Sequence, residues 1–192
     1  MERDRNHLDR SDNARASRSA NHTERPEREA THRATAPSTS IQAEVATLLR
    51  TAGIHAALAY LNARTRCRFT GVYQVDPPLL RNVHLFDREN PDLNIAGEVS
   101  SLDIGYCGIV CETGAPFTTS DAQHDPRLRA HAARDSMLAY AGAPIRMPDG
   151  RAWGTVCHFD LRPRIIVPEE LSVLVTVTPL FATWVREHCG AS

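Results

Sequence analysis

Residues 139–160 constrain the fold of this chain more than any other stretch. Two runs of alternating small, apolar and polar residues flank Met147-Pro148-Asp149-Gly150. An Asp-Gly pair between two such runs is a strong signal for a β-hairpin, because glycine supplies the positive φ that a tight turn needs. One face of the second strand is predicted to carry Trp153, Thr155, Cys157 and Phe159. The remaining segments are expected to pair with this hairpin or to cover it.

The first 40 of the 192 residues differ in composition from the rest. They contain two large apolar side chains, Met1 and Leu8, against eight arginines and seven acidic residues. Such a segment buries too little apolar area to offset an ordering cost of roughly 1–2 kcal/mol per residue. We therefore expect a disordered tail over residues 1–40 and a single folded domain over residues 41–188.

Charge and hydropathy argue against two classes of partner. The residues after the predicted tail hold 14 of the 22 basic residues and 16 of the 23 acidic residues, and no basic stripe stands out. Nucleic acid is therefore not expected as a partner. No apolar run approaches the length of about 18 residues that a transmembrane helix needs, so no membrane association is expected either.

The cysteines indicate the compartment. There are five of them, an odd number with wide spacing, and no apolar leader precedes them. This pattern favours reduced thiols in the cytoplasm over a disulfide framework in a secreted protein. Two of the cysteines, Cys107 and Cys111, are spaced to share one face of a helix. The neighbours Cys157 and His158 point to opposite faces of a strand, so these four residues are not expected to form a metal site.

The order of predicted elements defines the fold class. Apolar residues recur at helical spacing over residues 41–64, with an interruption at Gly53. Two alternating strands follow at 67–75 and 79–86, then a helix at 104–112 that Asp103 begins and Gly114 ends, and a helix at 127–137. The hairpin precedes a last helix that begins at Pro168 and contains Pro179. Because hairpins rather than crossovers join most strands, we predict an α+β fold with an antiparallel sheet.

Several motifs within residues 41–188 resemble those of the GAF domain family, a relative of the PAS domains. In chain order they are Phe69-Thr-Gly-Val-Tyr73, Gly105-Tyr-Cys-Gly-Ile-Val-Cys-Glu-Thr-Gly114, Pro116-Phe117, Asp121-Ala122, Asp125-Pro-Arg-Leu128, Gly142-Ala-Pro-Ile145, Asp149-Gly150 and Gly154-Thr155. The resemblance implies a sheet of about six strands, with the first and last helices on one face and a mixed helix and loop cover, residues 98–137, on the other. In the family, a ligand lies between cover and sheet where one is bound.

One enzyme branch of the family, free methionine-(R)-sulfoxide reductase, is similar to this chain at two places. Its Cys-Gly pair matches Cys107-Gly108, and its His-Ile-Ala-Cys-Asp run matches residues 131–135. Arg134 stands where that branch has its catalytic cysteine. A guanidinium cannot attack a sulfoxide, because the reaction requires a thiolate. The resemblance therefore implies a member without that activity, unless another thiol takes over.

The sequence supports a non-catalytic sensory or regulatory domain that binds a small molecule between sheet and cover. Two other hypotheses remain open, a thiol-dependent reductase and a ligand-free interaction module. The candidate ligand-binding residues are Tyr106, Cys107, Asp121, Arg134, Tyr140 and His158. The sequence does not identify a cofactor or ligand, and its output is expected to pass through a partner protein or a homodimer. Apolar positions of the first and last helices suggest the dimer interface: Leu48, Leu58, Leu171 and Phe181.

Overall fold

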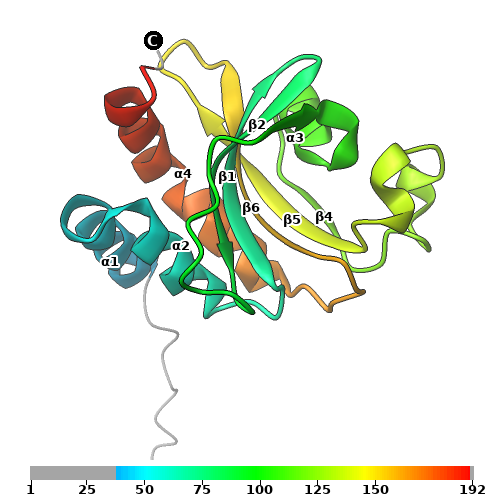
Figure 1. Ribbon diagram of the computed structural model, residues 1–192, viewed down its shortest axis with the longest axis horizontal. Coiled ribbons are helices and arrows are strands. Elements are labelled where there is room, and N and C mark those ends of the chain that lie inside the picture. The colour runs from blue at the N-terminus through cyan, green and yellow to red at the C-terminus, as the bar shows by residue number, and fades with distance from the viewer. Residues whose placement is uncertain (1–37, 191–192) are drawn as a thin grey trace, which may run out of the picture. The chain divides into compact units, whose positions relative to one another are not determined.

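The computed structural model describes residues 38–190, which form one antiparallel sheet between two layers of helices and loops (Figure 1). The strand order is β3-β2-β1-β6-β5-β4. The strands are β1 (Phe69–Asp76), β2 (Leu79–Asp87), β3 (Val99–Ser101), β4 (Phe117–Thr119), β5 (Ala139–Arg146) and β6 (Ala152–Asp160). The predicted α+β class and the six-strand antiparallel sheet are confirmed. Nearly all of the predicted tail lies outside the described residues.

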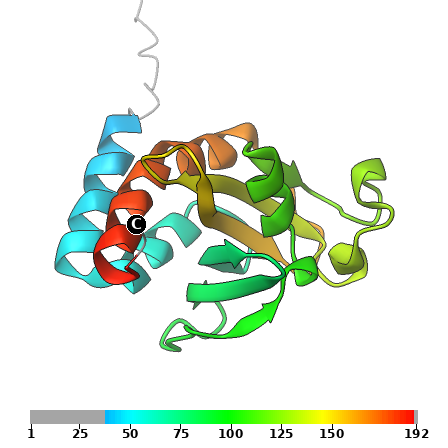
Figure 2. The same cartoon turned by 90° about the horizontal axis from the view of Figure 1, so that it is seen from above.

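Three helices cover one face of the sheet, as predicted (Figure 2). They are α1 (Ser38–Thr51), α2 (Gly53–Asn62) and α4 (Pro168–His188). Gly53 adopts a φ of +83°, which separates α1 from α2. Leu58 and Phe181 are fully buried against the sheet in the core that these helices form. None of the helices in the described part of the chain is long and apolar enough to cross a membrane.

Helix α4 continues through Pro179 for 21 residues. A proline has no N–H, so the carbonyl four residues earlier, that of Val175, loses its usual helical donor. The Thr178 hydroxyl donates to this carbonyl over 3.0 Å and replaces the missing hydrogen bond. A side chain next to the proline therefore compensates for the missing donor, and the predicted helix continues past Pro179.

The predicted hairpin is formed by β5 and β6, and Gly150 has the expected positive φ of +85° in its turn. The pairing register shifts between Ile145 and Arg146, which marks a β-bulge near the turn. Beyond this bulge Trp153 packs into the core on the helix side, whereas Cys157 and Phe159 face the cover. The expectation that Trp153 shares a face with these two residues was wrong, because one irregular pair reverses the alternation.

The cover on the other face contains α3 (Cys107–Thr113) and three short 3-10 turns, η1 (Leu102–Ile104), η2 (Pro126–Leu128) and η3 (Ala132–Asp135). Gly114 ends α3 with a φ of +62°, as predicted. Asp103 does not begin α3, because it lies within η1.

The continuous helix expected over residues 127–137 is absent, and the two turns η2 and η3 take its place. Local caps compete successfully with the helix here. The Asp125 carboxylate accepts the Arg127 N–H over 3.0 Å, and the His131 ring nitrogen accepts the Ala133 N–H over 3.2 Å.

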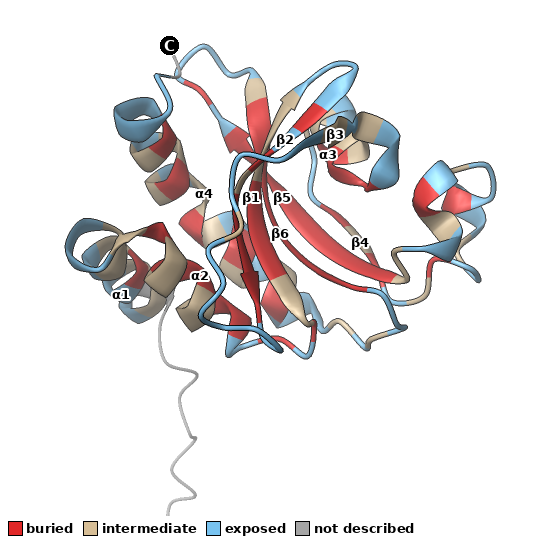
Figure 3. Cartoon of the chain, viewed as in Figure 1, coloured by how far each residue is buried: buried red, intermediate tan, exposed pale blue. Residues whose placement is uncertain are grey.

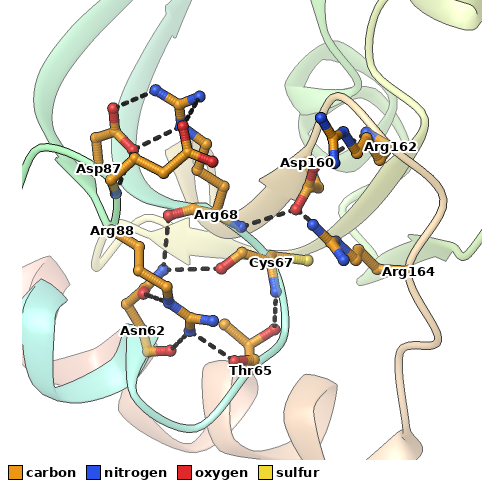
Figure 4. A network of polar contacts seen from close by, with 10 residues as sticks. Asn62, Thr65, Cys67, Arg68, Asp87, Arg88, Asp160, Arg162 and Arg164 are labelled. Carbon is orange, nitrogen blue, oxygen red and sulfur yellow. Dashed lines mark hydrogen bonds and ion pairs between the residues drawn. The ribbon is translucent and has the colours of Figure 1, made fainter.

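A polar network joins α2 to one end of the sheet (Figure 4). The buried Asn62 amide donates to the Cys67 and Arg68 carbonyls, both over 3.2 Å, and to the Thr70 hydroxyl over 2.8 Å. The Asn62 side-chain oxygen accepts a hydrogen bond from the Arg88 guanidinium over 2.9 Å. On the other side of this corner the buried Asp160 carboxylate accepts the Arg68 N–H over 3.0 Å. One asparagine therefore connects α2 with β1 and with the segment after β2.

Candidate functional site

A row of small residues crosses the three central strands on the face beneath the cover. Cys157 of β6 pairs with Gly71 of β1 on one side and with Gly142 of β5 on the other. Because neither glycine has a side chain, the Cys157 thiol is the single side chain of this row. Strands β5 and β6 form the most continuously buried part of the sheet (Figure 3).

Two tyrosines fill the space above the glycines. A Cβ added to Gly142 would lie 2.1 Å from the Tyr140 hydroxyl, and a Cβ added to Gly71 would lie 2.8 Å from Tyr73 Cε2. Each tyrosine side chain therefore lies along its own strand, over the glycine two residues away. Tyr140 is fully buried, and its pKa is raised well above the usual range by desolvation. The two phenol rings therefore lie over the two glycines that pair with Cys157.

Cys107, the first residue of α3, brings a second thiol to this place. Its sulfur accepts the Thr155 hydroxyl over 3.1 Å and the Tyr140 hydroxyl over 3.6 Å. A hydrogen bond with the Cys157 thiol is the largest cause that lowers the pKa of Cys107, and the Thr155 and Tyr140 hydroxyls lower it further. Burial raises the pKa of Cys157, so Cys107 is the more acidic thiol of this pair. We call these four residues the thiol cluster: Cys107, Tyr140, Thr155 and Cys157.

Tyr106 connects the cover to the thiol cluster. Its side chain is fully buried, and its hydroxyl donates to the Met137 carbonyl over 2.9 Å. The ring centroid lies 5.6 Å from that of Tyr140, in an edge-on arrangement, and 4.8 Å from that of His131. Desolvation raises the pKa of Tyr106 to about 12, so the hydroxyl stays a donor at neutral pH. Three of the six predicted residues, Tyr106, Cys107 and Tyr140, are thus in one place.

Asp121 and Arg134 lie elsewhere in the cover. The Asp121 carboxylate accepts the His124 ring N–H over 2.8 Å, and this contact lowers the pKa of Asp121. The Arg134 guanidinium donates to the Gln123 carbonyl and lies 3.4 Å from the Asp135 carboxylate. Within residues 38–190, no hydrogen bond or ion pair joins Asp121 or Arg134 to the thiol cluster.

His158 faces the opposite side of the sheet. Its Nδ1 is 2.7 Å from the Thr70 hydroxyl, and this hydroxyl accepts a hydrogen bond from the Asn62 amide. Desolvation lowers the pKa of this buried imidazole to about 3, so it is neutral at physiological pH. His158 therefore belongs with α2 and not with the cover.

A hollow of about 600 Å³ opens between α3 and the ends of β1 and β6. The sheet side of this hollow is formed by Gln74, Val75, Asp76, Ala152 and Trp153. The cover side includes Leu102, Gly108, Cys111 and Glu112. Its volume lies in the range of small-molecule sites, roughly 300–1,000 Å³. Cys111 lines this hollow, one turn of α3 away from the buried Cys107, so the two cysteines have different surroundings despite their spacing. None of the six predicted site residues lines it.

The sequence did not name Thr155 or Cys157 as candidate site residues, and it did not indicate the hollow beside α3. Alternation already placed Thr155 and Cys157 on one face of a strand. Cys107 was predicted as a candidate, but its contact with Thr155 was not, because no sequence signal shows where α3 packs along β6. Within residues 38–190, no three His, Cys, Asp or Glu side chains are grouped closely enough to hold a metal ion.

Comparison with known proteins agrees with this architecture. The model of the GAF domain family matches residues 36–183, and the chain belongs to this family. No curated protein matches the chain in sequence.

Three solved structures show the range of proteins that share the fold. The GAF domain of an Acinetobacter phosphoenolpyruvate-protein phosphotransferase is 12% identical with a TM-score of 0.62, covering 80% of this chain and 95% of that one. Free methionine-R-sulfoxide reductase from Neisseria meningitidis is 14% identical with a TM-score of 0.59, and the match covers 81% of this chain and 92% of that one. The chromophore-binding domain of a Stigmatella aurantiaca bacteriophytochrome is 13% identical with a TM-score of 0.59, and the match covers 81% of this chain and 63% of that one. At these identities the similarity extends to the fold alone.

Proposed function

We propose that this protein is a non-catalytic sensory domain that binds a small molecule in the hollow between α3 and the ends of β1 and β6. The observation that carries the proposal is the hollow itself, about 600 Å³ bounded by both sheet and cover. A ligand in this position contacts both layers at once. Its binding therefore changes how α3 is held against the sheet, and a partner protein can detect that change.

The lining favours a ligand with an apolar body and an amine or amide group. Val75 and Leu102 offer apolar surface, the carboxylates of Asp76 and Glu112 offer acceptors, and the Arg151 guanidinium also lines the hollow, where it pairs with Asp149. An amine or amide group of the ligand is the natural partner of these carboxylates.

A thermal-shift screen with small amines and amides tests this proposal. Full binding at about 100 times the dissociation constant adds roughly 2.7 kcal/mol to the free energy of unfolding. For a domain of this size that corresponds to a rise in Tm of about 5–10 °C. In Cys111→Phe the larger side chain projects into the hollow and obstructs the ligand, and the rise should become smaller. Cys111→Ser, which keeps the volume, is the matched control and should respond like the wild type.

Two outcomes would overturn the proposal. If no compound raises Tm, the ligand-free interaction module is the better description. If a compound raises Tm equally in Cys111→Phe, the ligand binds elsewhere.

Reductase activity is tested separately, by incubating the protein with free methionine-(R)-sulfoxide and a thiol reductant. We expect no turnover, because Arg134 occupies the position of the catalytic cysteine in that branch. Its guanidinium is bonded to Gln123 and Asp135.

We propose a cytoplasmic location, which the thiols support. All five cysteines are free, and three of them, Cys67, Cys107 and Cys157, are buried. Reduced thiols in this number are typical of proteins in a reducing compartment.

We also propose that the protein is a homodimer that pairs through α4. Residues 171–185 of this helix contain no charged side chain, although Ser172, Val175, Pro179 and Thr183 form an exposed stripe. A stripe facing only water normally carries charge. Grooves of about 530 Å³ and 370 Å³ flank it, one against β5 and one against α1. A ridge between two grooves suits a second copy, because the ridge of each helix fits a groove of the other without like-charge contact.

Light scattering at several protein concentrations tests the dimer. Val175→Glu places a charge in the middle of the stripe and is expected to weaken association at least tenfold. Val99→Glu is the matched control, because Val99 has a similar exposure, 47% against 44% for Val175, but lies on strand β3. A wild-type monomer at the highest concentration, or an equal effect of both substitutions, would contradict pairing through α4.

A further inference from the structure

We propose that Cys107 and Cys157 are an oxidation site, in which a small peroxide converts the two buried thiols into a disulfide between α3 and β6. This inference does not depend on the ligand proposed above, since the thiol cluster and the hollow share no residue. The Cys107 sulfur lies 3.1 Å from the hydroxyl of Thr155, two residues before Cys157 on the same face of β6, and both cysteines belong to one buried cluster that joins the two layers of the fold. A bond between them would link the cover covalently to the sheet.

Two buried hydroxyl groups are directed at the Cys107 sulfur. Cys107 Sγ accepts from Thr155 Oγ1 over 3.1 Å and from the Tyr140 hydroxyl over 3.6 Å. Donors directed at a sulfur stabilise its thiolate, which is the form that reacts with peroxide. Cys157 has a raised pKa and stays protonated, as suits the second thiol of a disulfide.

The remaining cysteines lack this arrangement. Burial raises the pKa of Cys67 to about 11 and that of Cys111 to about 12. Among the described residues, no hydroxyl donates to the Cys111 sulfur. Desolvation also raises the pKa of Cys189. Peroxide chemistry is therefore expected at the thiol cluster in preference to the other sites.

The reaction balances with peroxide as the oxidant. The Cys107 thiolate attacks one peroxide oxygen, the O–O bond breaks, and the departing hydroxide takes up a proton to give water. Cys107 is then a sulfenic acid. The Cys157 sulfur attacks the Cys107 sulfur, loses its proton, and displaces the hydroxyl group as a second water. Two thiols lose two electrons and two protons, and one peroxide is reduced to two waters.

Burial sets the size of the oxidant. Cys107 and Cys157 are 3% and 1% exposed, so a reagent must pass between cover and sheet. Hydrogen peroxide is about as small as water. A bulky organic hydroperoxide should react at least tenfold more slowly, and an exposed thiol would not discriminate in this way.

The experiment treats the full chain with hydrogen peroxide, alkylates the remaining thiols under denaturing conditions, and maps the cysteines by mass spectrometry without reduction. We expect a peptide pair linked through Cys107 and Cys157, which a dithiol reductant separates. Thr155→Val and Tyr140→Phe each remove one donor to Cys107 and should slow formation of the linked pair about tenfold, the effect of one pKa unit on the thiolate fraction. Tyr73→Phe is the matched control, because its hydroxyl makes no hydrogen bond to Cys107, and its rate should equal that of the wild type.

Three results would overturn the assignment. One is that both cysteines remain open to alkylation while Cys189 is oxidised. Another is a linked pair that includes Cys67 or Cys111 in place of either thiol. The third is an equal rate in the wild type, Thr155→Val and Tyr140→Phe. Mapping the wild-type chain gives an answer even if a substitution impairs folding.

Discussion

Gly154→Ala is expected to lower the free energy of unfolding by about 3 kcal/mol or more, a larger loss than most single substitutions cause. A Cβ on Gly154 would lie 2.0 Å from the Tyr73 carbonyl oxygen and 3.0 Å from its carbon. These are backbone atoms of the neighbouring strand, so no side-chain rotation can relieve the clash. Strands β1 and β6 would have to separate. Thermal and denaturant unfolding measure the loss, which corresponds to a fall in Tm of roughly 6–12 °C.

Gly105→Ala is the matched control for this prediction. Gly105 has an extended backbone with a φ of −154°, and an added Cβ would make an ordinary contact of 3.4 Å with the Met137 side chain. Its effect should stay within about 0.5 kcal/mol, the usual range for a substitution without a special mechanism. Similar losses for the two substitutions would mean that β1 and β6 are not as close at Gly154 as described.

Asn62→Ala is expected to cost roughly 2–4 kcal/mol, the second large effect. The substitution removes the amide donor to the Cys67 carbonyl and the Thr70 hydroxyl. It also removes one acceptor of the Arg88 guanidinium, which keeps the Asn62 and Thr65 backbone carbonyls. Each unpaired buried polar group costs about 1–3 kcal/mol, and the missing amide also leaves a cavity. Denaturant unfolding with an unchanged m-value would show that the native state alone is affected.

Two further variants separate the causes. Asn90→Ala also removes an amide donor, one that reaches Asp87 over 2.8 Å, but from an exposed residue, and we expect a loss below about 1 kcal/mol. Asn62→Asp retains the oxygen for Arg88 but directs a second oxygen at two carbonyls. It should destabilise at least as much as Asn62→Ala. If Asn62→Asp were harmless, the donor role assigned to the amide would be wrong.

Much of the fold was accessible from local sequence patterns. The Asp149-Gly150 pair located the hairpin, Gly114 located the end of α3, and Pro168 located the start of α4. Each of these signals depends on backbone preferences within a few residues. Predictions failed where a side chain made a local exception. The His131 cap divided the expected helix over residues 127–137.

The candidate site was predictable only in part, because its residues meet through pairing between distant strands. Tyr106, Cys107 and Tyr140 were named from family motifs and lie together. Cys157 was considered beside His158, its neighbour in sequence, whereas its neighbours in space are Gly71 and Gly142. Strand β1 pairs with β6, whose paired residues lie 80 to 90 positions further along the chain, and alternation alone does not specify that register. For the same reason the sequence did not point to the hollow beside α3.

The two tyrosines that lie over glycines also bear on how such a domain diverges. Gly71 with Tyr73, and Gly142 with Tyr140, behave as linked pairs, because a larger residue at either glycine displaces the ring above it. Replacement of a tyrosine by a small residue would instead leave space directly over Cys157. In descendants of this sequence we therefore expect these positions to change in pairs. Two coupled substitutions on the strands, with the cover unaltered, would be enough to replace the space that the tyrosine rings occupy by a ligand-binding cavity.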